Sequence, residues 1–73
     1  MRKVILNLAY ELDRAKAFAF AGFVFQKMET SPARPKEDFP ILIEWDDYRC
    51  IFRMTKAGTY VLNIEPLNPI PEN

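Results

Sequence analysis

The sequence contains no histidine and only one cysteine. Histidine most often serves as the general base at neutral pH and as a ligand of transition metals, so both chemistries lack their usual residue. Cys50 has no histidine to activate it and no second cysteine with which to form an internal disulfide. These absences predict a protein that is not an enzyme and that holds no cofactor or metal.

The sequence also has no excess of charge of either sign, because ten lysines and arginines balance ten aspartates and glutamates. A net charge of zero removes the field that draws nucleic acid phosphates or an anionic membrane surface to a protein. We therefore expect that nucleic acid is not the partner of this protein.

Long apolar runs are absent as well. The longest, residues 17–25, has nine residues, whereas a membrane-spanning helix needs about 20. The first residues do not combine a cationic segment, an apolar segment and a small-residue cleavage site, so we expect no secretion signal. The sequence predicts a cytoplasmic protein without a membrane partner.

The sequence is instead rich in apolar residues. Of its 73 residues, 49% are hydrophobic and 14% are aromatic, which is typical of a folded chain and not of a disordered one. This length is about half that of a typical domain, so we predict a single domain over residues 1–73. Residues 30–40 and 66–73 each contain three prolines, and we predict a surface loop and a tail there.

Residues 41–65 predict a three-stranded antiparallel meander with strands at about 41–45, 48–54 and 59–65. Each stretch alternates between apolar and polar residues. Asp46-Asp47 forms the first predicted turn, and Gly58 takes the left-handed position in the second. This register pairs apolar residues across the strands: Trp45 with Tyr48, Ile43 with Cys50, Ile41 with Phe52, Met54 with Tyr60, Phe52 with Leu62, and Cys50 with Ile64.

The opposite face of the predicted sheet carries a row of alternating charge. The same register sets Glu44 beside Arg49 and Arg49 beside Glu65, so no like charges meet. A slip of one residue would exchange the two faces, and the register is therefore strongly specified.

Residues 1–29 must cover the apolar face, because a three-stranded sheet with one apolar face needs a second layer. The alternation over residues 4–8 predicts a strand. Residues 12–28 are rich in helix formers and end near Ser31-Pro32, which favours a helix. They could instead form a strand with a bulge at Ala21-Gly22. The predicted fold class is α+β, and the alternative is an all-β five-stranded small barrel.

Phe18, Phe20, Phe23 and Phe25 form the candidate interface. At 100° per residue they spread around a helix, whereas a sheet contacts a stripe of roughly 100°. A second copy of the chain would cover the remainder in a two-fold dimer, and Gly22 would permit close approach of the two backbones. We therefore expect a homodimer.

The sequence thus predicts a small non-catalytic module that binds protein or regulates it, with itself and an unknown protein as partners. One alternative is a nucleic-acid-binding accessory factor, for which Arg34, Lys36 and Arg53 form a weak candidate surface. A second alternative is a small β-barrel that binds a ligand in its mouth. Strand alternation points Arg49 and Arg53 away from the aromatic residues of the sheet, which favours a core role for those rings over stacking on nucleobases.

Overall fold

The computed structural model describes residues 3–31, 36 and 38–68, which form one helix and four strands. In chain order these are β1 (Val4–Leu8), α1 (Arg14–Thr30), β2 (Ile41–Trp45), β3 (Tyr48–Met54) and β4 (Tyr60–Pro66). The predicted α+β class, with a strand and one helix before the meander, is confirmed. The all-β barrel is wrong because the phenylalanine-rich segment is helical, and the barrel-mouth ligand site has no basis in this fold.

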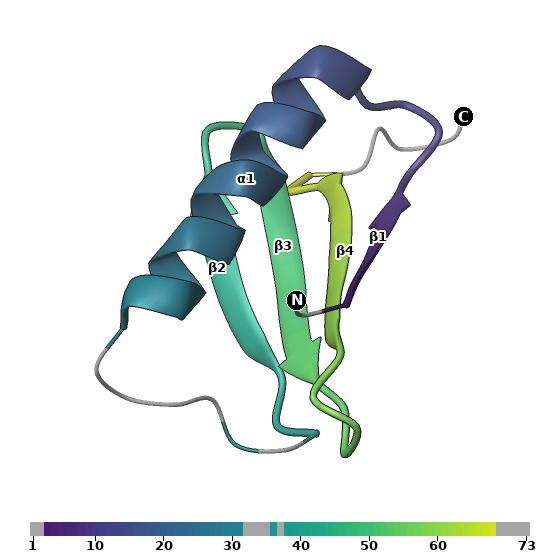
Figure 1. Cartoon of the computed structure of the whole chain (residues 1–73). Helices are drawn as coiled ribbons and strands as arrows, with labels where there is room; N and C mark the ends of the chain where they lie inside the picture. Colours follow the sequence, from purple (N-terminus) through teal and green to yellow (C-terminus); the bar gives the residue numbers. More distant parts are fainter. Residues whose placement is uncertain (1–2, 32–35, 37, 69–73) are drawn as a thin grey trace.

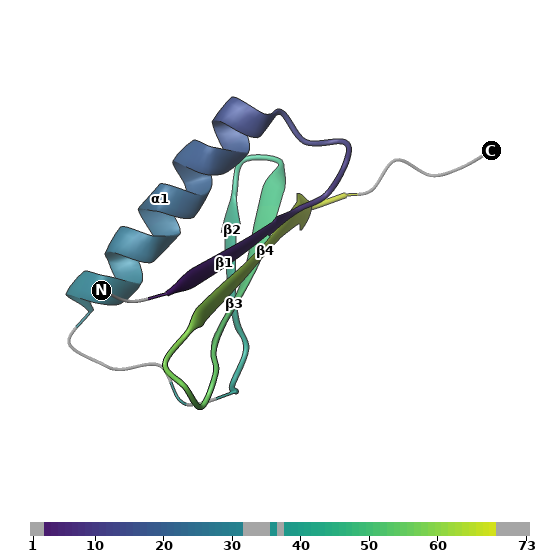
Figure 2. The same cartoon turned by 45° about the vertical axis from the view of Figure 1, so that its right-hand side comes forward.

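The four strands form one sheet in the order β1-β4-β3-β2. Helix α1 runs obliquely across one face of this sheet (Figure 1). Turning the molecule shows that α1 lies on one side only, and that no described element covers the other face (Figure 2). The molecule is therefore a two-layer structure with an open sheet face and an open outer helix face.

The meander has the register that the sequence predicts. Every expected cross-strand pair is present in the β2–β3 and β3–β4 ladders, including Glu44 with Arg49 and Arg49 with Glu65. Asp46 and Gly58 take positive φ angles of 54° and 82° at the two turns, which tight turns require and which glycine adopts without steric cost. The last strand spans Tyr60–Pro66, one residue later than predicted.

The core lies between α1 and the inner face of the sheet. Among its fully buried side chains are Phe20 and Val24 from the helix and Phe52 and Leu62 from the strands. Phe52 meets Tyr60 edge to face, with 4.8 Å between the ring centroids, a preferred aromatic geometry. The apolar sheet residues thus pack against one stripe of the helix.

Strand β1 pairs in parallel with β4 and forms one edge of the sheet. The pairing places Asn7 beside Asn63, and the Asn7 amide donates a hydrogen bond of 2.9 Å to the Asn63 side-chain oxygen. Leu6 and Leu8 pack against the core. The predicted strand over residues 4–8 is therefore confirmed, and its pairing adds a fourth strand to the meander.

The predicted proline-rich loop, residues 30–40, and tail, residues 66–73, each overlap the preceding element by one residue. Helix α1 ends at Thr30 and β2 begins at Ile41, and Pro66 closes β4. Residues 32–35 and 37 of the loop and 69–73 of the tail lie outside the described residues. Within the part of the chain that is described, no helix is both long and apolar enough to cross a membrane.

Candidate interface on the outer face of the helix

The four phenylalanines of α1 point to different surroundings. Phe20 is 2% exposed and belongs to the core, and Phe25 is half-buried with its ring edge-on to Tyr60 at 5.8 Å. Phe18 and Phe23 are 55% and 53% exposed. The predicted interface therefore contains two rings that contact the protein's own core and two that face outward.

Helical geometry explains this division. The buried helix residues Ala17, Phe20, Ala21 and Val24 share one face, and successive residues turn by about 100°. Phe18 and Phe23 therefore lie about 140° from each other, one toward β1 and one toward β2. Between them runs an exposed line of smaller or polar residues, which together with Phe18 and Phe23 we call the outer face of α1: Ala15, Ala19, Gly22 and Gln26.

An apolar hollow lies on the β1 side of α1. It has a volume of about 290 Å³ and is lined by Phe18, Gly22 and Phe25 of the helix, among others, with Val4 and Leu6 of β1. Val4 is exposed at this sheet edge. We call this the β1-side hollow.

A second, smaller hollow lies on the β2 side. Its volume is about 150 Å³, and its lining consists of Ala19, Phe20, Phe23 and Trp45. Trp45 is 43% exposed, and its ring centroid lies 5.5 Å from that of Phe20. The sequence places Trp45 correctly on the inner face of the sheet, but the ring lies at the margin of the core. We call this the β2-side hollow.

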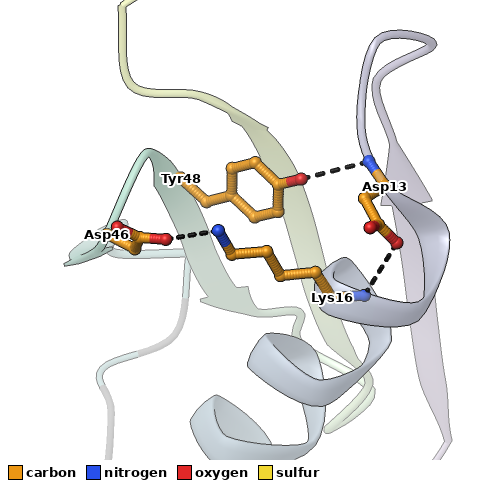
Figure 3. A network of polar contacts seen from close by, with 4 residues as sticks. All are labelled: Asp13, Lys16, Asp46 and Tyr48. Carbon is orange, nitrogen blue, oxygen red and sulfur yellow. Dashed lines mark hydrogen bonds and ion pairs between the residues drawn. The ribbon is translucent and has the colours of Figure 1, made fainter.

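Polar contacts hold the first turn of α1 over the turn between β2 and β3 (Figure 3). The Asp13 carboxylate caps the helix by accepting a hydrogen bond of 3.2 Å from the Lys16 backbone N–H, and the Asp13 backbone N–H donates one of 3.0 Å to the Tyr48 hydroxyl. The Lys16 ammonium forms an ion pair with Asp46. The hydrogen bond to Asp46 raises the pKa of Lys16 above its ordinary value. This network fixes the position of the outer face relative to Trp45.

The charges of the open sheet face and its rim are partly compensated. Arg49 pairs with Glu65 at 3.2 Å, and Arg53 of the weak candidate surface pairs with Asp38 at 3.6 Å. Lys36 is exposed, and Arg34 lies outside the described residues. Of the weak candidate surface, the described residues thus include only Lys36 and Arg53, and the surface stays a prediction.

Among the described residues, Cys50 is the candidate nucleophile, and the carboxylates and Cys50 are the candidate metal ligands. Cys50 is fully buried, and burial raises the pKa of its thiol to about 11, which disfavours the reactive thiolate. No group of three carboxylate or cysteine side chains among the described residues is arranged to hold a metal ion.

Comparisons with other proteins found no relative: no family model, no curated protein and no solved structure matches the chain. A proposal of function therefore rests on the outer face of α1 and its two hollows. The sequence identifies Phe18 and Phe23 there, but it does not single out Ala15, Ala19 and Gln26. Their spacing of four, then seven, residues along a helix is the signal that marks them as neighbours on one face.

Proposed function

We propose that this protein is a small non-catalytic binding or regulatory module that forms a homodimer through the outer face of α1. The observation that carries the proposal is the exposure of Phe18 and Phe23, each more than half open to solvent on either flank of the helix. Contiguous apolar surfaces of this kind mark protein interaction sites. Trp45, Ala19 and Gly22 extend the same apolar surface.

The energetics favour a weak dimer. Half of a phenylalanine side chain is about 100 Å², which at about 25 cal/mol per Å² corresponds to roughly 2.5 kcal/mol when it is buried. Four such rings in a dimer contribute about 10 kcal/mol, against an association cost of about 4–15 kcal/mol. Burial of the smaller residues between the rings adds to the gain. A dimer forms only where the association cost lies near the low end of that range; the balance is then about −6 kcal/mol, which corresponds to a dissociation constant of tens of micromolar.

The charge distribution supports a protein partner over a nucleic acid. Lys16, Arg49 and Arg53 each pair with a carboxylate, so they are already partly neutralised before any phosphate approaches. The outer face of α1 is instead largely apolar. A dimer formed there leaves the open sheet face accessible, and we assign that face to the further protein partner.

Sedimentation equilibrium from about 1 to about 300 μM tests the dimer, a range that brackets a micromolar dissociation constant. Wild-type protein should pass from monomer to dimer. Phe18→Glu and Phe23→Glu should each remain monomeric with an unchanged far-UV spectrum, because a charge replaces a ring at the interface. Leu42→Glu is the matched control, since Leu42 is 63% exposed and lies on the open sheet face.

Leu42→Glu should dimerise like wild type. Two results would overturn the proposal: a wild-type protein that stays monomeric at the highest concentration, or phenylalanine variants that dimerise as well as wild type.

A further inference from the structure

We infer that two copies of this protein pair their α1 helices antiparallel about a two-fold axis midway between Phe20 and Ala21. This inference rests on the proposed homodimer and specifies its geometry. The residues of the outer face are symmetric about that point: positions 15 and 26, 18 and 23, and 19 and 22 lie at equal distances on either side of it. An antiparallel two-fold pair brings together residues related in this way.

The line of residues between the phenylalanines fits such a pair. Ala19 of one copy would face Gly22 of the second copy, and Ala15 would face Gln26. Small residues at the centre let the helix axes approach to the lower end of the usual range of 8–10 Å. Nothing lies within 4 Å of the position that a Cβ on Gly22 would take in the single chain, so this space is open to a second helix.

The phenylalanines fit the hollows of the second copy. A two-fold axis perpendicular to the helices keeps both Phe18 rings on the β1 flank and both Phe23 rings on the β2 flank. The two rings of each kind are offset by five residues, or about 7.5 Å, along the helix. Phe18 of the second copy therefore lies level with Phe23 of the first, between the Gly22 and Phe25 that line the β1-side hollow.

Phe23 of the second copy lies level with Phe18 of the first, on the β2 flank. Trp45 occupies the same level, because it contacts Phe20 and the Lys16 ammonium. The Phe23 ring of the second copy thus reaches the β2-side hollow, which Ala19, Phe20 and Trp45 line. Each hollow receives one aromatic ring, and the same contact forms twice in the dimer.

Charge and size favour the antiparallel over the parallel direction. Antiparallel helices oppose the two helix dipoles, which is the favourable arrangement for neighbouring helices. A parallel pair would set Gln26 against Gln26 and Ala15 against Ala15. The larger glutamines would then hold the helices apart at one end.

Cysteine cross-linking with the variants Ala15→Cys and Gln26→Cys distinguishes the two directions. Both positions are exposed on α1, and the native Cys50 stays in place because it is buried. In the antiparallel pair, the thiol introduced at position 15 of one copy would lie opposite the thiol introduced at position 26 of the other. Identical positions would be about 16 Å apart along the axis.

An equal mixture of the two variants is oxidised mildly, and the products are identified by intact mass. Ala57→Cys, at the exposed turn between β3 and β4, reports random collision. The expected result is a mixed disulfide that forms at least about tenfold faster than any self-linked product or the Ala57→Cys product, because facing thiols are held within disulfide distance.

Self-linked products in place of the mixed one would overturn the antiparallel geometry while leaving the α1 dimer intact. Dimers seen by sedimentation without cross-linking above the Ala57→Cys level would overturn both the geometry and the α1 interface. Absence of a dimer by sedimentation would overturn the proposed function itself.

Discussion

At the residue scale, Phe18 and Phe20 show how two identical side chains take opposite roles. They are two positions apart, so they point about 160° from each other around the helix. Phe20 is buried in the core, whereas Phe18 is mostly exposed beside β1. Composition alone makes both of them core candidates, and their place on the helix decides which one is available to a partner.

Phe52 and Arg49 provide a comparison between the two faces of one strand. Phe52 is fully buried and contacts Tyr60, so Phe52→Ala should lower the free energy of unfolding by about 3–5 kcal/mol through lost burial and the cavity left behind. Arg49→Glu sets like charges beside Glu44 and Glu65 on a partly exposed face, and should cost about 1 kcal/mol or less. Urea unfolding of both variants checks this order. A Phe52→Ala loss below about 1 kcal/mol would contradict the assignment of this face to the core.

Cys50 provides a test of core integrity. The thiol is fully buried, so a thiol reagent at about pH 8 should label native protein at least about 100-fold more slowly than urea-unfolded protein, because labelling requires opening of the core. Fast labelling of the native protein would contradict the burial of Cys50. Reading the extent of labelling across a urea series should reproduce the unfolding curve seen by circular dichroism.

The pH dependence of Cys50 has a defined sign. Burial raises the folded-state pKa from an ordinary 9.0 to about 11, so the folded state favours the protonated thiol. This contribution to stability is fully present below about pH 9 and is lost as the pH rises through about 11. Wild-type protein should therefore lose more stability across this range than Cys50→Ala, which lacks the thiol. Equal losses in urea melts of the two proteins would contradict the raised pKa.

At the element scale, α1 is apolar around much of its circumference, so its pattern cannot indicate which side faces the sheet. The Asp13 cap and the last helical residue, Thr30, can be understood from local sequence.

The meander is the most predictable part, because alternation and turn residues specify its register together. The parallel pairing of β1 with β4 is different: its partners are 56 positions apart, as Asn7 and Asn63 show. No local signal in Val4–Leu8 selects β4 over β2.

Gly22 is the position where helix stability and dimerisation should separate. Gly22 is exposed, and an added Cβ would meet nothing within 4 Å in the single chain. Gly22→Ala should therefore stabilise the monomer by about 0.5–1 kcal/mol through helix propensity. In the proposed dimer the same methyl group meets the facing helix and should weaken association.

Urea melts at about 1 μM protein measure the first effect and sedimentation equilibrium the second, on either side of a micromolar dissociation constant. A variant with unchanged dimerisation would place Gly22 outside the interface. A variant with a less stable monomer would contradict its open surroundings in the helix.

At the scale of the whole molecule, a sheet of four strands and one helix leaves two broad faces without a covering element among the described residues (Figure 2). The open sheet face carries charged and amide side chains beside its apolar ones, as the Glu44, Arg49 and Glu65 row shows. The outer face of α1 has two exposed phenylalanines next to two apolar hollows. The sequence alone predicts a dimer from the number of phenylalanines, whereas the structure shows which two of them are exposed.

In the proposed dimer, the outer face of α1 is buried against a second copy. A dilution series of amide ¹⁵N–¹H spectra, from about 500 to about 10 μM, tests it residue by residue across a micromolar dissociation constant. We predict that dilution moves the amide signals of Phe18, Ala19, Gly22 and Phe23 and the indole signal of Trp45, while Ile51 and Arg53 on the open sheet face stay unchanged. Spectra that do not change with concentration, or changes centred on Ile51 and Arg53, would contradict the claim.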